Sequence, residues 1–151
     1  MKNINTRVRR GERGSALIEA ALTLPLLLLV SVGIFEFGRL FQTWQVLTNA
    51  AREGARIAVL PGTASGDVQA RVRQYLQDGQ LGGYAGATIV VDRAASIPIG
   101  AGVASASVVT VNYPYDFMVL NPVARLVVSS STLGAPITIS AAAEMRNESP
   151  F

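Results

Sequence analysis

Hydrophobic and polar positions divide the chain into an apolar block near the N-terminus and a longer region of mixed sequence after it. The block, residues 15–35 (SALIEAALTLPLLLLVSVGIF), is 21 residues long and has one charged side chain, Glu19. A helix of that length rises about 31 Å, which matches the hydrocarbon core of a bilayer. The pattern therefore predicts one transmembrane helix followed by a small domain.

The helical pattern continues over residues 36–60, and Pro61 and Gly62 then end it. Its apolar stripe changes from large side chains beside the apolar block to small side chains further along. The large residues fall where an interfacial aromatic belt would lie, and the small ones predict close packing against a sheet. The stripe consists of Phe37, Phe41, Trp44, Thr48, Ala51, Ala55 and Ala58, and Ala50 and Gly54 widen its small part.

Two ion pairs at i,i+3 spacing are expected on this helix, one between Glu36 and Arg39 and one between Glu53 and Arg56. Pairs at this spacing on a helix surface contribute about 0.2–0.5 kcal/mol each. We expect them to be structural and not part of a binding site.

Past Pro61 a short helix is expected over residues 67–77, with Ser65 or Asp67 as its N-cap. The glycine-rich residues 79–86 are expected to form a flexible connection. On the helix, Val68, Val72, Tyr75 and Leu76 are expected to face inward, and Arg71 and Arg73 to face solvent.

Three later stretches have strand character, and two of them alternate between apolar and hydroxyl side chains as half-buried antiparallel strands do. The expected strands are residues 88–93, 105–113 and 137–145, with a turn region at 95–102 and Pro114 ending the middle strand. Together the patterns predict an α+β fold, in which a long N-terminal helix packs on a small antiparallel sheet. The expected parts are a leader (1–14), a helical region (15–60) and a domain (61–151).

Residues 115–133 are expected to contain a short helix starting at Pro122. Their apolar side chains could belong to the core or form a contact surface for a partner. We expect core, because a domain this small needs all its apolar residues. The residues concerned are Met118, Val119, Leu120, Val123, Leu126 and Val127.

Charge is distributed unevenly along the chain. The formal net charge is +3, but the first 14 residues hold five of the 13 cations and one of the 10 acids, so residues 15–151 carry −1. The domain therefore offers no basic face, and we expect no nucleic-acid partner. The basic leader, expected to be disordered, predicts a cytoplasmic N-terminus and an extracytoplasmic domain.

Composition also bears on chemistry. The chain has neither cysteine nor histidine, and its only lysine is Lys2. A thiol nucleophile, a histidine base and a Ser–Lys dyad are therefore excluded, and the acids show no paired spacing. We expect no enzymatic activity, no cofactor, no metal site and no small-molecule substrate.

Two residues of the apolar block, Glu19 and Pro25, are unusual for a simple membrane anchor. Glu19 is expensive in a membrane segment, and either pairs with the α-amino group of a neighbouring subunit or marks the headgroup interface. Pro25 lacks a backbone N–H and predicts a kink or loosening of the helix near residues 23–26. The hydroxyls of Thr23 and Ser31 are expected to bond back to the preceding turn.

The start of the block is similar to a class III, type IV-pilin-like signal. Gly14 follows Arg13 and precedes four uncharged residues and Glu19. Such signals are cleaved by a membrane peptidase after the glycine, here between Gly14 and Ser15, and the helix stays on the mature protein. Ordinary signal-peptidase cleavage fits less well, because bulky residues follow Gly33 where small ones are needed.

Four motifs in order resemble TadE-like proteins, pilin-like components of the tight-adherence (Flp-type) pilus assembly system. They are SALIE (15–19), LPLLLL (24–29), GIFEFGR (33–39) and AAREGAR (50–56), and residues 137–148 resemble the family's C-terminal end more loosely. The resemblance implies a minor pilin in the cytoplasmic membrane, with other pilin-like subunits, pilus assembly proteins and a prepilin peptidase as partners. The alternatives are an uncleaved single-pass protein whose outer domain binds a partner of a secretion or adhesion machine, and a secreted protein freed by signal peptidase.

Overall fold

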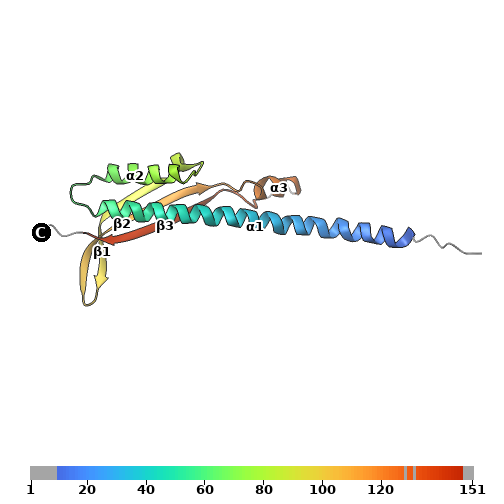
Figure 1. The fold of residues 1–151 in the computed structure, drawn as a ribbon, viewed down its shortest axis with the longest axis horizontal. Coiled ribbons are helices and arrows are strands. Elements are labelled where there is room, and N and C mark those ends of the chain that lie inside the picture. The colour runs from blue at the N-terminus through green and yellow to red at the C-terminus, as the bar shows by residue number, and fades with distance from the viewer. Residues whose placement is uncertain (1–9, 128, 131, 148–151) are drawn as a thin grey trace, which may run out of the picture. The chain divides into compact units, whose positions relative to one another are not determined.

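The computed structural model describes residues 10–127, 129–130 and 132–147, and divides into two compact units, residues 1–35 and 36–151. The first unit contributes the N-terminal part of one long helix, and the second contains the rest of that helix and the sheet (Figure 1). This confirms the α+β class. The elements are α1 (Arg10–Ala58), α2 (Ser65–Asp78), the 3-10 turn η1 (Tyr84–Gly86), β1 (Thr88–Ile99), β2 (Gly102–Tyr115), α3 (Leu120–Val127) and β3 (Ile137–Arg146).

Helix α1 starts earlier than the end of the expected leader. Residues 10–14 are helical, so the expectation of disorder is wrong for them, while residues 1–9 lie outside the described part of the chain. Arginine and glutamate are good helix formers, and no proline precedes the apolar block to stop the helix. At its other end α1 stops at Ala58, three residues before Pro61.

The sheet has the order β1-β2-β3 and is antiparallel throughout. Ile89 lies opposite Val111, which lies opposite Ala141, and all three are buried on the same face. The residues that alternate with them, such as Val90 and Ala142, are exposed. One face therefore carries the core, as the alternating pattern predicted.

The small-residue part of α1 packs against that core. Ala50, Ala51 and Ala55 are fully buried. A Cβ added to Gly54 would lie 2.6 Å from a methyl of Val72 in α2 and 3.0 Å from a methyl of Val109 in β2. Helix α1 thus packs against both α2 and the sheet at Gly54, where there is no room for a larger side chain, and this confirms the predicted close packing.

The first hairpin is longer than expected. The expected turn region, 95–102, is wrong, because β1 continues to Ile99 and only Gly100 and Ala101 lie between the strands. Gly100 has a φ of 57°, which suits the first central residue of a type II′ turn. Pro98 is tolerated because β1 is an edge strand, and a bulge follows Asp92.

The prediction that Pro114 ends the middle strand is also wrong. Strand β2 continues to Tyr115, with Pro114 opposite Thr138 of β3. Pairing with β1 has already ended at Asn112, so β2 has a partner on one side only at this point. A missing N–H costs little in that setting.

The glycine-rich connection after α2 contains the turn η1 and contacts the core, and its expected flexibility stays a prediction. Leu81 and Tyr84 pack against the core, and the Gly83 amide donates to the Tyr113 hydroxyl at 3.1 Å. At the start of α2 the Asp67 carboxylate accepts from the Ala64 amide at 3.2 Å, which fixes the first turn. The inward positions Val68, Val72 and Leu76 are fully buried, Tyr75 is half-buried, and both arginines are exposed, as predicted.

The expected short helix exists as α3, starting two residues before Pro122. The expectation that its apolar side chains join the core is wrong for Met118 and Val123, which are 61% and 38% exposed. Val119 and Leu120 are only half-buried, and the side chains of Leu126 and Val127 lie outside the described set. Tyr115 and Phe117, whose rings meet edge to face, already occupy the adjoining core.

Candidate membrane anchor and the Glu36 cluster

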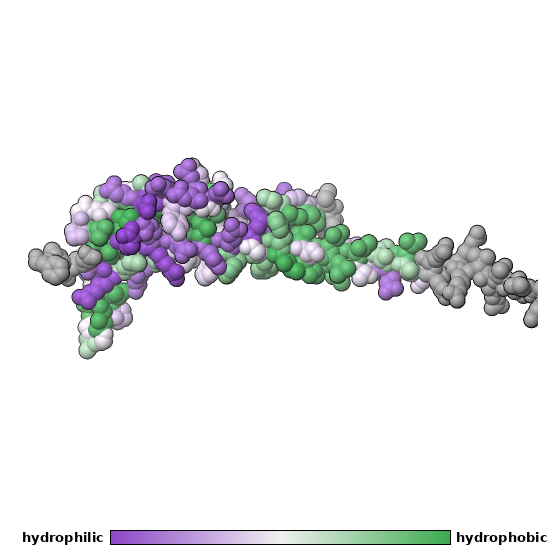
Figure 2. Space-filling model, in the orientation of Figure 1, coloured by the Kyte–Doolittle hydropathy of each residue, from purple (hydrophilic) through white to green (hydrophobic). Residues whose placement is uncertain are grey.

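The apolar side chains of the first unit are exposed around the whole helix. Leu17, Ile18, Leu22, Leu24, Leu26, Leu27, Leu28, Leu29, Val30, Ile34 and Phe35 are 52–74% exposed. An 18-residue window of this helix has a mean hydropathy of 2.3 with none of it buried, so the helix is long and apolar enough to span a membrane. The hydrophobic surface is visible along this segment in Figure 2. A helix that is apolar all round needs lipid or other helices around it.

The predicted processing and register residues lie on this helix. Gly14, Ser15 and Glu19 are helical and exposed. Within the described part of the chain, the Glu19 carboxylate has neither a hydrogen-bond nor an ion-pair partner, and a neighbouring chain could reach it. Cleavage after Gly14 and a pairing role for Glu19 stay predictions.

Pro25 lies inside α1, which is assigned as one helix from end to end. The Thr23 hydroxyl donates to the Glu19 carbonyl, and the Ser31 hydroxyl donates to the Leu27 carbonyl at 2.8 Å. These contacts confirm the expected bonds to the preceding turn. The kink at Pro25 stays a prediction.

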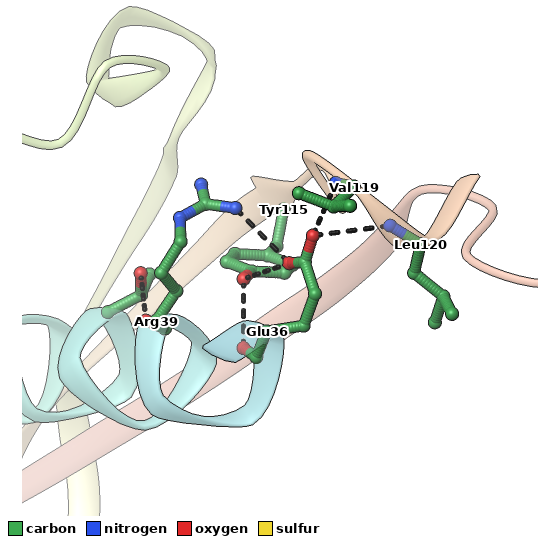
Figure 3. Close-up of polar contacts among 6 residues, drawn as sticks. Glu36, Arg39, Tyr115, Val119 and Leu120 are labelled. Carbon is green, nitrogen blue, oxygen red and sulfur yellow. Dashed lines mark hydrogen bonds and ion pairs between the residues drawn. The ribbon is translucent and has the colours of Figure 1, made fainter. Parts of the chain in front are cut away.

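The second unit begins with a buried carboxylate, Glu36, which is 1% exposed. One of its carboxylate oxygens accepts from the backbone amides of Val119 and Leu120, the latter at 3.3 Å. The other accepts from Arg39 at 3.2 Å and lies 3.5 Å from the Tyr115 hydroxyl, which also donates to the Glu36 carbonyl at 3.4 Å (Figure 3). A single side chain of α1 thus binds the first turn of α3.

Aromatic and cationic groups surround this carboxylate. The Arg39 guanidinium lies 5.5 Å from the centre of the Tyr115 ring, and Phe117 meets that ring edge-on at 5.2 Å between centroids. Burial raises the pKa of the Tyr115 hydroxyl; the positive charge of Arg39 opposes the shift and the negative charge of Glu36 adds to it. The hydroxyl therefore stays protonated and able to donate.

The ion pair between Glu36 and Arg39 forms as the sequence predicted. The sequence, however, predicted a surface pair that contributes little to stability. It missed the bonds to residues 115, 119 and 120, which are about 80 positions away in the chain. One signal could have pointed to them. Glu36 is an acid placed directly between the apolar block and an aromatic stripe, where a carboxylate needs partners.

The second predicted pair also gains an unpredicted partner. Glu53 binds Arg56 through two bonds of 2.9 and 2.8 Å, and Arg71 of α2 donates to it at 3.2 and 3.1 Å. The hydrogen bonds from Arg56 lower the pKa of Glu53 from 4.5 to about 2; partial burial opposes this shift and the Arg71 bonds add to it. This cluster joins α1 to α2 at the surface.

The described residues contain no recognisable cluster of catalytic side chains. Within that part of the chain no three or more carboxylates come together as a metal site would require. The grooves there lie beside α1 and are lined mainly by glycine, glutamine, arginine and tyrosine.

Comparison with known proteins finds a family match to part of the chain. Residues 14–56 match the TadE-like protein family. Most of helix α1 is therefore similar to TadE-like proteins. The match begins at the predicted processing site and contains Glu19, Glu36 and Gly54, which confirms the resemblance seen in the motifs. It covers 43 of the 151 residues and ends before α2, so the sheet lies outside it. No curated protein and no solved structure matches the chain.

Proposed function

We propose that this TadE-like chain is a minor pilin (pseudopilin) of the tight-adherence pilus. It is anchored in the cytoplasmic membrane by residues 15–35, with its N-terminus in the cytoplasm and its α+β domain on the other side. It acts in pilus assembly by helix bundling and subunit packing, not by catalysis. The observation that carries the proposal is the family match over a helix whose apolar side chains are exposed all round.

Glu19 has a specific part in this proposal. Burying a carboxylate at the bilayer centre costs about 2.5–3.5 kcal/mol, and the cost is lower near the interface. Glu19 lies one turn inside the membrane segment, so its burial still has a cost that a partner of opposite charge would reduce. Cleavage between Gly14 and Ser15 would create an α-amino group at the start of the helix. The amine of one subunit and the Glu19 carboxylate of its neighbour then pair and set the stagger of the bundled helices.

The first experiment determines the N-terminus of the protein isolated from membranes of its native host, by mass spectrometry. We expect a chain that begins at Ser15 and is lost when the prepilin peptidase is deleted. A chain that begins at Met1 would refute processing and favour the uncleaved envelope protein. A start near residue 36 or later would refute both membrane proposals and indicate signal-peptidase release.

A second experiment tests Glu19 by itself. The variant Glu19→Gln removes the charge and keeps the shape, and Glu53→Gln is the matched control in the outer domain. We expect Glu19→Gln to be processed and inserted normally but to reduce pilus number by about tenfold, corresponding to a lost pairing of about 1.4 kcal/mol. Equal piliation of the two variants would contradict the pairing role.

A further inference from the structure

The segment around α3 exposes apolar side chains although it is fastened to the rest of the domain. Met118 and Val123 are 61% and 38% exposed, and hydrophobic residues are visible at the surface over α3 in Figure 2. The helix itself (LNPVARLV) contains a single charged residue, Arg125, which is exposed. Exposed apolar side chains together with a cationic one are the composition of helices that lie in a membrane surface.

The position of this segment is fixed by Glu36. The Glu36 carboxylate accepts from the amides of Val119 and Leu120, so α3 begins within one side-chain length of α1. Glu36 is also the next residue after Phe35, the last residue of the apolar block, and adjacent Cα atoms are about 3.8 Å apart. Because Glu36 follows the apolar block directly in the chain, the start of α3 is held within a side-chain length of the residue at which that block ends.

That level is the membrane interface if residues 15–35 span the bilayer. The headgroup region on each side of the hydrocarbon core is about 5–8 Å thick, which is comparable with the reach of a glutamate side chain. A bilayer surrounds a helix on all sides, so an element fastened beside Glu36 meets lipid whichever side of α1 it occupies. Phe37 and Phe41, 74% and 56% exposed, are further apolar side chains near this level that lipid would cover.

We propose that residues 118–127 lie in the boundary between the headgroups and acyl chains of the membrane that α1 crosses. Met118 and Val123 contact the acyl chains, Arg125 contacts lipid phosphates, and Glu36 is the positioning residue that holds α3 at this depth. The inference rests on the membrane anchoring in the proposed function and adds a second lipid contact to it. A second copy of this chain is the competing occupant of the apolar face.

The chain contains no cysteine, so single cysteines can be labelled without background. We would label Val123→Cys with an environment-sensitive fluorophore in the full chain. The protein would be reconstituted into phosphatidylethanolamine–phosphatidylglycerol vesicles whose lipids carry a nitroxide either near the headgroup or near the acyl terminus. We expect the shallow nitroxide to quench this label roughly twofold more than the deep one, as interfacial burial of 5–10 Å requires.

Two further single cysteines serve as controls. Leu27→Cys lies in the apolar block and should be quenched by the deep nitroxide, and Arg73→Cys lies on the exposed face of α2 and should not be quenched. Quenching of Leu27→Cys without quenching of Val123→Cys would refute the inference and leave the anchor intact. No quenching of Leu27→Cys would instead refute the anchor itself. Quenching at position 123 by a nitroxide on a second chain, and not by lipid, would assign the surface to a subunit contact and refute the lipid contact.

The positioning role of Glu36 has its own test in the labelled chain. Glu36→Ala should reduce the shallow quenching at position 123 to near the level of the Arg73→Cys label, while deep quenching at position 27 stays unchanged. Glu36→Gln keeps one acceptor oxygen and should restore quenching in part. Unchanged quenching at position 123 in Glu36→Ala would show that α3 finds the membrane without Glu36 and would refute the positioning role.

Discussion

Gly54 allows a sharp test of the packing between α1 and the sheet. An alanine in place of a helical glycine normally stabilises a helix by about 1 kcal/mol. At this position the added Cβ would lie 2.6 Å from a Val72 methyl and 3.0 Å from a Val109 methyl. Both valines are fully buried, and β-branched side chains cannot easily turn away. We therefore expect Gly54→Ala to destabilise the domain.

The size of the effect follows from two opposing contributions. Overpacking of a well-packed core costs about 1–3 kcal/mol, and two close contacts on different elements place this case near the upper end. Subtracting the helix-propensity gain of about 1 kcal/mol leaves a loss of about 2 kcal/mol. Gly38→Ala is the matched control on the same helix, because a Cβ there would meet nothing within 4 Å. It should be neutral or more stable by up to about 1 kcal/mol.

The assay is urea unfolding of the full chain in a mild detergent, followed by far-UV circular dichroism and by the fluorescence of Trp44, the only tryptophan. A double-mutant cycle with Val72→Ala isolates the contact, because that change removes the nearer methyl. Gly54→Ala should cost at least 1 kcal/mol less in the Val72→Ala background than in the native one. If Gly54→Ala is as stable as Gly38→Ala, or if the two changes are additive, the reasoning about close packing is refuted.

Three other stability predictions concern polar clusters and use the same assay. Glu36→Ala should cost about 3 kcal/mol, because it leaves the amides of Val119 and Leu120 and the Arg39 guanidinium without their carboxylate partner, and a loss below 1 kcal/mol would contradict the buried cluster. Glu53, whose pKa falls from 4.5 to about 2 on folding, should stabilise the domain by about 1 kcal/mol above pH 4.5 and lose this contribution as the pH falls through 2. The stability gap between the native chain and Glu53→Gln should therefore close on acidification, and a constant gap would disprove the linkage. Asn147→Ala should cost about 1–2 kcal/mol, because its side chain accepts from Ser107 at 2.7 Å and donates to Ser105 at 2.6 Å; an unchanged urea midpoint would argue against this contact.

Patterns local in sequence predicted most of the fold. The small residues from Ala50 to Ala58 forecast a helix packed closely on a sheet, and the alternation in β2 and β3 forecast which strands have one buried face. These signals work because the period of apolar side chains is set by backbone geometry within one element. The same reasoning predicted the ion pairs of Glu36 and Glu53, which are three residues from their partners.

The predictions were wrong where the energetic cost of placing a residue in an element depends on the tertiary structure around it. Pro98 and Pro114 suggest interruptions, but each lies where its strand lacks a partner on one side, and this depends on strand order and register. The bonds of Glu36 to Val119 and Leu120 are equally out of reach, because no periodicity connects residues more than 80 positions apart. The burial of apolar side chains near α3 was overestimated for a related reason. The expectation that these side chains are buried assumes that every apolar residue packs in the core of a single isolated chain.

That assumption fails where a chain has apolar surfaces that other molecules cover. The exposed side chains of residues 15–35 and those of Met118 and Val123 are apolar surfaces that an isolated soluble domain would bury. The TadE-like match includes the helical segment that carries the first surface, and the Glu36 contacts hold the start of α3 beside Glu36, the residue that follows this segment. One membrane can cover both surfaces. Under the proposed function, extraction of the subunit into a pilus would expose both surfaces together, and neighbouring subunits would then have to cover the surface around α3.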